Sequence, residues 1–296
     1  MTRKTMHLIL GNDCAVTVHE PPLPLTPRFS LSGEYVTVSP HTDQPTHETL
    51  LSETFGSVDW LWSGDDEFRF AAADRGLRGV ILTVPETLAT DAESDRMRSW
   101  GRAPRVPGNV RAVDSRHFDA RPTRVRWVSE TGDQVVCAYE SGAGGASQDV
   151  LRLRSAPCFD LVFVDRALSG WILDRPADFL VQEWEYAPSR PAPDGVADVL
   201  RDCLGTFGEA TIGRMQDGEA AAPEVLRSLR ARAPTCRRTP VATCCATSWA
   251  GSWRAGVTRL PAESRRAGRP SAAVPARPRF DLRHPRGTLY GSIGQA

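Results

Sequence analysis

Two stretches of the chain, 91 positions apart, share an ungapped pattern that constrains the fold more than any other feature of the sequence. Residues 68–85 and 159–176 agree on Asp-Arg-x-Leu-x-Gly-x-Ile-Leu-x-x-Pro. An internal repeat, where one is present, sets the architecture of a whole domain. The pattern therefore predicts a duplicated structural unit. The shared positions are Asp74, Arg75, Leu77, Gly79, Ile81, Leu82 and Pro85 in the first copy and Asp165, Arg166, Leu168, Gly170, Ile172, Leu173 and Pro176 in the second.

Alternating apolar residues upstream of the shared pattern indicate that each copy is built from strands. Apolar side chains recur at every second position in residues 68–72 and 159–163, and residues 60–62 and 151–153 do the same. A period of two is typical of a strand with one face on a core. We therefore expect two related antiparallel β-meanders. They would cover residues 58–85 and 149–176.

The Asp-Arg pair of each copy falls at the predicted turn between the second and third strands. An aspartate at a turn accepts hydrogen bonds from the backbone that follows it, so turn chemistry is the favoured interpretation. The alternative is a pseudo-symmetric pair of charged sites on matching loops. Gly79 and Gly170 fall inside the third strand, where glycine indicates a bulge or the close approach of another backbone. We expect Pro85 and Pro176 to end that strand.

Hydrophobic periodicity and turn residues predict the remaining elements. Residues 194–204 carry the apolar stripe of one helical face, with Asp194 as the N-cap. Residues 102–121 lack any periodicity and are expected to form a linker. The members of the stripe are Val196, Val199, Leu200, Cys203 and Leu204. The other predicted elements are strands at 8–10 and 15–20, a hairpin of 29–31 with 35–38, helices at 41–53 and 87–100, a hairpin of 123–127 with 134–139, and a helix from Pro223.

Together these elements predict an α+β fold dominated by the two meanders. We expect a β-rich core at residues 1–190, which contains both copies of the repeat. A helical segment at residues 191–232 should pack on that core, and an irregular basic tail should follow at residues 233–296.

The charge of the chain is balanced overall but unevenly distributed. Residues 1–232 carry 34 acidic and 25 basic side chains, a net charge of −9, whereas residues 233–296 carry 2 acidic and 11 basic ones, a net charge of +9. Lys4 is the single lysine among the 36 Lys and Arg residues, which is typical of a coding sequence rich in G and C. One interpretation of the tail is a disordered basic arm that binds nucleic acid through phosphates, with Trp249 and Trp253 stacking on unpaired bases.

The competing interpretation is that the tail is translated in a shifted reading frame. It combines many prolines and arginines with clustered tryptophan and cysteine, and it has no sustained period. Residues 241–256, back-translated with codons ending in G or C and read two bases later, give Arg-Asp-Val-Leu-Arg-Asp-Gln-Leu-Gly-Arg-Leu-Val-Ala-Arg-Gly. This resembles an amphipathic helix and repeats the Asp-Val-Leu-Arg-Asp-x-Leu-Gly of residues 198–205. We favour the frameshift, which the nucleotide sequence tests directly: an alternative frame must keep coding character throughout.

The lack of a recognisable signal peptide and the pattern of cysteines favour a cytoplasmic protein. The first ten residues contain two basic side chains but an apolar run too short for the core of a signal peptide. No stretch approaches the roughly 18 apolar residues of a membrane helix. The seven cysteines are odd in number and include no C-x-x-C, so they indicate neither a disulfide framework nor a zinc site. No membrane partner is expected.

A metal site is one interpretation of the histidines in the predicted helix near residue 45. His41 and His47, with Asp43 between them, could join Glu53, but their spacing is not that of a helical H-x-x-x-H pair. Solvated loop histidines are the default interpretation. The glycine-rich residues 142–145 lack the Lys-Ser/Thr of a phosphate loop, and no nucleophile elbow or dinucleotide fingerprint occurs. We therefore expect no metal and no cofactor.

Two carboxylate clusters offer a further interpretation. Glu183 and Glu185 alternate on an apparent strand and would share one face, which is either simply exposed or an acid/base pair. A hydrolase would need them to converge with His117 or His47 in a pocket. Residues 65–67, Asp-Asp-Glu, fall at a predicted turn, where acidic residues are common.

The absence of catalytic motifs favours a non-enzymatic binding or interaction protein with an unknown protein partner, whose acidic body masks that partner. A DNA-binding regulator that uses residues 233–296 is the first alternative, and a hydrolase that uses Glu183 and Glu185 is the second. An aromatic binding groove is a further possibility, although aromatic residues on alternate strand positions usually belong to the core. Its members would be Tyr35, Trp60, Trp62 and Trp171.

Overall fold

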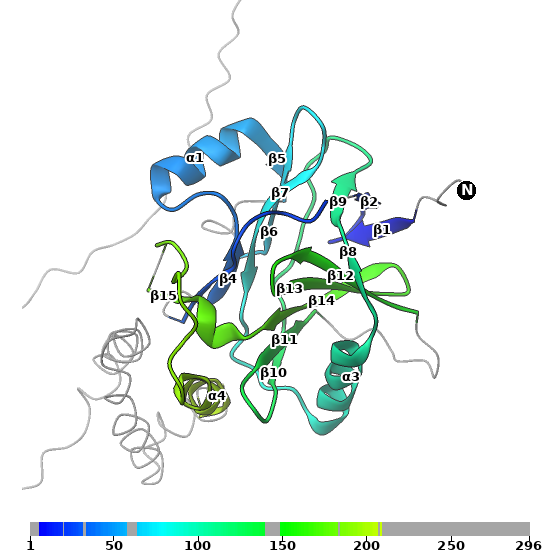
Figure 1. The fold of residues 1–296 in the computed structure, drawn as a ribbon. Coiled ribbons are helices and arrows are strands. Elements are labelled where there is room, and N and C mark those ends of the chain that lie inside the picture. Colours follow the sequence, from blue (N-terminus) through cyan, green and yellow to red (C-terminus); the bar gives the residue numbers. More distant parts are fainter. Residues whose placement is uncertain are drawn as a thin grey trace, which may run out of the picture. The chain divides into compact units, whose positions relative to one another are not determined.

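The computed structural model describes residues 6–19, 21–31, 34–57, 64–139, 149–182, 184–206 and 208. All of them belong to one compact unit, residues 1–258. They form an α+β fold of two β-sheets with three α-helices and one 3₁₀ helix (Figure 1). Within these ranges, none of the helices has the length and apolar character needed to cross a membrane.

The larger sheet contains nine strands and the smaller contains six, and the helices lie between strands along the chain. The strands are β1 (His7–Leu10), β2 (Cys14–His19), β3 (Arg28–Ser30), β4 (Tyr35–Val38), β5 (Thr54–Gly56), β6 (Glu67–Ala71), β7 (Leu77–Thr83), β8 (Arg105–Pro107), β9 (Asn109–Ala112), β10 (Val125–Val128), β11 (Gln134–Ala138), β12 (Val150–Ala156), β13 (Phe159–Val164), β14 (Ala167–Asp174) and β15 (Leu180–Val181). The helices are α1 (Gln44–Glu53), α3 (Asp91–Arg102), α4 (Val196–Thr206) and the 3₁₀ helix η1 (Pro176–Phe179).

The larger sheet has the order β8-β12-β13-β14-β1-β2-β9, while β11 also pairs with β14 and β10 pairs with β11. Its two outer strands, β8 and β9, are separated in the chain by Gly108 alone. Because β8 pairs with β12 and β9 pairs with β2, this continuous segment closes the sheet on itself. A Cβ on Gly108 would lie 3.1 Å from both Leu153 Cδ1 and Val18 Cγ1, so glycine permits this close corner.

The smaller sheet has the order β15-β3-β4-β7-β6-β5, in which β15 runs parallel to β3 and the other neighbours are antiparallel. One hydrophobic cluster contains buried side chains of both sheets, such as Phe29 and Phe68 from the smaller and Leu161 and Trp171 from the larger. The main core therefore lies between the two sheets.

Strands β11, β13 and β14 are covered on both faces. In β13, Leu161 and Phe163 pack in the main core, whereas Val162 packs in a second cluster with Met97 and Trp100 of α3. Successive side chains of a strand point to opposite faces, so each of these strands serves both clusters. This double burial explains why the sequence of β13 is almost continuously apolar.

Two buried arginines hold the carboxyl ends of helices. Arg69 donates hydrogen bonds to Leu51 O at 3.2 Å and Thr54 O at 3.0 Å, at the end of α1. Arg126 donates to Leu204 O, in the last turn of α4, from Nε at 3.2 Å and from Nη2 at 2.6 Å. Carbonyls in the last turn of a helix lack intrahelical partners, and a cation there also offsets the helix dipole. Arg69 thereby fixes α1, which carries part of the candidate site, against β6.

A hairpin is present in each predicted copy of the repeat, but the duplication itself is not confirmed. The hairpin β6–β7 belongs to the smaller sheet and β13–β14 to the larger one. Each has a register shift, just before Gly79 in one and just before Gly170 in the other. Both glycines also meet close neighbours, since an added Cβ would lie 2.8 Å from Ser39 Oγ or 2.4 Å from Cys137 O, respectively.

The pairing of the two hairpins differs around the turn. Arg69 pairs with Gly79 in the first hairpin, whereas Val162 pairs with Gly170 in the second. Structurally corresponding residues of the two hairpins are therefore 91 positions apart after the turn but 93 positions apart before it. The reason is that the connection in the first hairpin is two residues longer. The strand beside β6 is β5, and the predicted first strand at residues 58–63 lies outside the described residues.

Turn chemistry accounts for Asp74 but not for Asp165. Asp74 Oδ1 accepts a hydrogen bond from Gly76 N at 2.9 Å, and Asp165 Oδ1 accepts one from Asp149 N at 3.1 Å. The first is the local contact that aspartate makes in a turn, whereas the second joins Asp165 to a residue 16 positions earlier, just before β12. The two pairs belong to different sheets, so nothing in the structure supports a pair of matching charged sites.

Most of the other local predictions are confirmed. The predicted hairpins correspond to β3–β4 and β10–β11, and the predicted helices to α1, α3 and α4. The linker predicted at residues 102–121 is wrong, because it contains β8 and β9. The strand predicted at residues 183–186 is also wrong, because residues 184–186 are not in a strand. The helix predicted from Pro223 and the tail at residues 233–296 lie outside the described residues.

Candidate functional site

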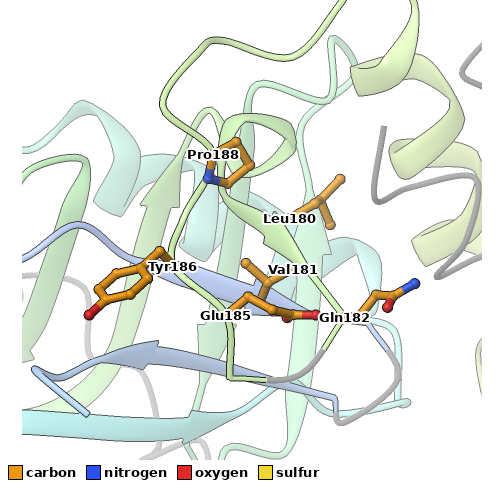
Figure 2. Close-up of a pocket in the computed structure, with 6 residues that line it drawn as sticks. All are labelled: Leu180, Val181, Gln182, Glu185, Tyr186 and Pro188. Carbon is orange, nitrogen blue, oxygen red and sulfur yellow. The ribbon is translucent and has the colours of Figure 1, made fainter. Parts of the chain in front are cut away.

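Two adjoining hollows lie along residues 180–188, next to the edge strand β15. We call them the Trp184 hollow, of about 470 Å³, and the Tyr186 hollow, of about 260 Å³. Figure 2 shows Tyr186 and Gln182 at opposite ends of the second hollow, with Val181 and Glu185 between them. Glu185 lines both, so the hollows adjoin. The Trp184 hollow is lined by Thr42, Asp43, Gln44, Trp184 and Glu185, and the Tyr186 hollow by Leu180, Val181, Gln182, Glu185, Tyr186 and Pro188.

Asp43 places a carboxylate in the Trp184 hollow because it is the N-cap of α1. Its Oδ1 accepts hydrogen bonds from Thr46 N at 2.8 Å and from Thr46 Oγ1 at 2.6 Å. These bonds hold the pKa of Asp43 below its ordinary value. The carboxylate is therefore anionic at neutral pH, and both of these bonds use Oδ1 rather than Oδ2.

Behind the hollow, Ser39 and His41 form a buried polar pair. Ser39 Oγ and His41 Nδ1 lie 2.7 Å apart. Burial, together with the nearby His47 and Arg28, lowers the pKa of His41 to about 3. His41 is therefore neutral at physiological pH.

His47 and Glu67 form a second buried pair, from α1 and β6. His47 Nε2 lies 3.0 Å from Glu67 Oε1 and 3.1 Å from Oε2. The two side chains are 0% and 1% exposed. The other ring nitrogen, His47 Nδ1, is buried and has no hydrogen-bond partner among the described residues. A buried polar atom without a partner is uncommon in native proteins.

Trp184 connects these buried pairs to the hollow. Its ring lies edge-on to His41, at 5.3 Å between centroids, and to His47, at 5.4 Å. The rings of His41 and His47 are 4.6 Å apart. The buried Arg28 fixes the backbone here, donating to Trp184 O at 2.9 Å and to Ser39 O at 3.2 Å.

Asp66 directly precedes Glu67 in the sequence and is also buried, but its hydrogen bonds are made with residues outside this cluster. Its Oδ1 accepts a hydrogen bond from Thr83 N at 2.7 Å, and its Oδ2 accepts one from Tyr139 Oη at 2.6 Å. Burial raises the pKa of Asp66 to about 7, although both hydrogen bonds oppose that shift. The turn predicted at residues 65–67 is wrong for Glu67, which begins β6, and both Asp66 and Glu67 are buried.

The predicted metal set is only partly brought together. His41 and His47 are neighbours and both buried, so the default interpretation as solvated loop histidines is wrong for them. Asp43 caps α1, and Glu53 lies exposed at the opposite end of that helix. Across the described part of the chain, no group of three or more His, Cys, Asp or Glu residues is arranged to hold a metal ion.

The predicted hydrolase set is also divided. Glu183 lies outside the described residues, whereas Glu185 is exposed and lines both hollows. His47 is buried and lines neither hollow. His117 lines neither hollow; its Nδ1 lies 3.1 Å from Gly56 O.

The predicted aromatic groove is not supported. Tyr35 and Trp171 are buried, 7% and 0% exposed, and they belong to different sheets. Trp60 and Trp62, like the glycine-rich residues 142–145, lie outside the described residues. The interpretation of these aromatics as core is confirmed for Tyr35 and Trp171.

Sequence reasoning missed Ser39, Glu67 and Trp184 as members of one cluster. No local pattern connects them, because they come from the end of β4, from β6 and from the segment after β15. The one available indication was the pair His41 and His47, six positions apart, for which solvated loop positions are the default expectation. No protein-family model, curated protein or solved structure matches this chain.

Proposed function

We propose that the chain is a non-enzymatic binding protein that holds a segment of a partner protein in the adjoining Trp184 and Tyr186 hollows. The observation that carries the proposal is the exposure of Tyr186, which is 80% accessible at the rim of a hollow. Tyrosine and tryptophan are enriched at protein interfaces, where they contribute most of the binding energy. Tyr186 and Trp184 are two positions apart and line adjoining hollows.

The polar groups around these aromatics support a partner segment rather than an apolar small molecule. Asp43, Gln44 and Glu185 line the Trp184 hollow, and Gln182 lines its neighbour. Small-molecule sites are mostly apolar and enclose their ligand. A polar rim around exposed aromatic anchors is instead the usual anatomy of a protein interface.

A peptide library displayed on phage and panned against the full chain tests the proposal. We expect enriched peptides to bind the unaltered chain and to lose at least about tenfold in affinity on Tyr186→Ala, since truncating an aromatic hot-spot residue costs about 2 kcal/mol or more and 1.4 kcal/mol is tenfold. Val106→Ala is the matched control, because Val106 is another exposed apolar residue, 40% accessible, on β8. Peptides that bind equally well to the Tyr186→Ala protein would contradict the proposed site.

A cytoplasmic location forms part of the proposal. It is supported by the four cysteines of the described residues, Cys14, Cys137, Cys158 and Cys203, which are all free thiols. The nucleic-acid alternative depends on residues 233–296, which lie outside the described residues, and no observation favours it. The hydrolase alternative likewise stays a prediction.

A further inference from the structure

The carboxyl group of Asp66 connects strand ends of the two sheets. Asp66 directly precedes β6 of the smaller sheet, and its Oδ1 accepts a hydrogen bond at 2.7 Å from the N–H of Thr83, the last residue of β7. Its Oδ2 accepts one at 2.6 Å from Oη of Tyr139, which directly follows β11 of the larger sheet. Tyr139 is held to β14 in turn, because its N–H donates to Ser169 O at 3.0 Å. A single side chain therefore joins the sheets at this point.

The backbone of Asp66 is held from two sides as well. Its N–H donates to Ala120 O at 2.7 Å, and its carbonyl accepts a hydrogen bond from Ser57 Oγ at 2.8 Å. These bonds fix the position of the carboxyl group between the sheets. A change in its charge therefore acts on the contacts with Thr83 and Tyr139.

Nothing in the described part of the chain balances a negative charge on Asp66. The residue is 0% exposed, and no Arg, Lys or His of that part forms an ion pair with it. The titratable groups that face it are Asp65, Cys137 and Tyr139, each of which is either neutral or negative. From β7 it meets the uncharged Thr83, and Arg126 of β10 acts on Cys137. Ionisation of Asp66 would therefore bury an uncompensated charge.

A buried carboxyl group without a cation tends to keep its proton, because the ionised form loses its hydration. Burial accordingly raises the pKa of Asp66 to about 7, although the hydrogen bonds from Thr83 and Tyr139 favour the carboxylate. A hydrated aspartate has its ordinary pKa of 3.8. Between these two values, a state that exposes Asp66 to water binds one proton fewer than the closed structure.

We propose that Asp66 is a proton-controlled latch between the two sheets. With its proton in place, the carboxyl group holds Thr83 and Tyr139 together. Loss of the proton favours a locally open state in which the carboxylate is hydrated and both contacts are released. Because opening releases one proton, the open state gains about tenfold in population per pH unit as the pH rises. The latch is independent of the proposed binding function, since Asp66 lines neither hollow.

Hydrogen exchange of single amides in the full chain, followed by NMR from pH 4.5 to 6.5, tests the latch. The amide of Thr83 is the reporter, because it donates to Asp66 Oδ1. After correction for the intrinsic, base-catalysed rate, we expect its protection to fall about tenfold per pH unit and to stay below that of the core amides of β13. Protection that does not change with pH would overturn the inference, because no proton would then be released. Protection equal to that of β13 would also overturn it, because the contact would then open only when the whole protein unfolds.

Two variants separate the latch from a merely structural role. Asp66→Asn should abolish the pH dependence of Thr83 protection, whereas Asp91→Asn, which removes an exposed carboxylate from α3, should leave it unchanged. Tyr139→Phe keeps the carboxyl group but removes a hydrogen bond that favours its ionised form, so the carboxyl ¹³C signal of Asp66 should titrate at a higher pH than in the unaltered chain. A pH dependence that persists in Asp66→Asn, or a titration that stays in place or moves to lower pH in Tyr139→Phe, would refute the latch. If Asp66→Asn fails to fold, the Tyr139→Phe titration decides.

Discussion

Two buried groups, His41 and Asp66, should change the free energy of unfolding with pH in opposite directions. Burial lowers the pKa of His41 from 6.5 to about 3, and burial raises that of Asp66 from 3.8 to about 7. Between pH 6.5 and 3 the unfolded chain binds a proton at His41 that the folded chain does not, so stability is lost as the pH falls. Between pH 3.8 and 7 the folded chain holds a proton at Asp66 that the unfolded chain has released, so stability is lost as the pH rises.

The two contributions overlap between pH 3.8 and 6.5 and oppose each other there. One proton corresponds to about 1.4 kcal/mol per pH unit. In the unaltered chain the contributions of these two groups therefore largely cancel each other. In the Asp66→Asn protein the amide oxygen can still accept from Thr83 N, and the amide N–H can donate to Tyr139 Oη, but the side chain no longer binds a proton. Its stability relative to the unaltered chain should therefore rise with pH, by about 3 kcal/mol from pH 4 to 6.5.

Urea unfolding followed by circular dichroism, at half-unit intervals from pH 4 to 7 and constant ionic strength, measures these differences. His41→Asn, which keeps a polar group near Ser39, should show the opposite trend, with stability falling relative to the unaltered chain as the pH rises. The exposed Asp91→Asn substitution is the control and should leave the slope unchanged. Curves for Asp66→Asn and the unaltered chain that run parallel across this range would refute the reasoning.

Two further predictions concern the framework around the site. Arg126→Met should lower the free energy of unfolding by about 3 kcal/mol, because it strands the Leu204 carbonyl inside the protein, whereas the exposed Arg78→Met should change it little in the same urea titrations. Gly170→Ala should lower the melting temperature, because its Cβ would lie 2.4 Å from Cys137 O, while Gly205→Ala in α4, where the new Cβ meets nothing within 4 Å, should raise it. Equal effects of the two alanine substitutions in calorimetry would contradict the close approach at Gly170.

Local patterns were enough to predict the helices and hairpins. The apolar stripe from Val196 to Leu204 is buried as its spacing predicted, because one face of a helix must cover a core wherever it packs. The β3–β4 and β10–β11 hairpins follow from short apolar runs around turn residues. These patterns depend only on residues a few positions apart, so they predict local structure without knowledge of the rest of the fold.

Only the tertiary structure decided how the elements pair and which polar groups are buried. Strands β8 and β9 have no periodicity of their own and exist because β12 and β2 offer them hydrogen-bonding edges. The repeat pattern likewise could not reveal that its two hairpins belong to different sheets. The sequence by itself determined the local elements, since helix stripes and turns are short-range. The cluster of His41, His47, Glu67 and Trp184 depends on contacts between residues up to 143 positions apart, and burial by such distant neighbours is what changes a solvated side chain into part of a site.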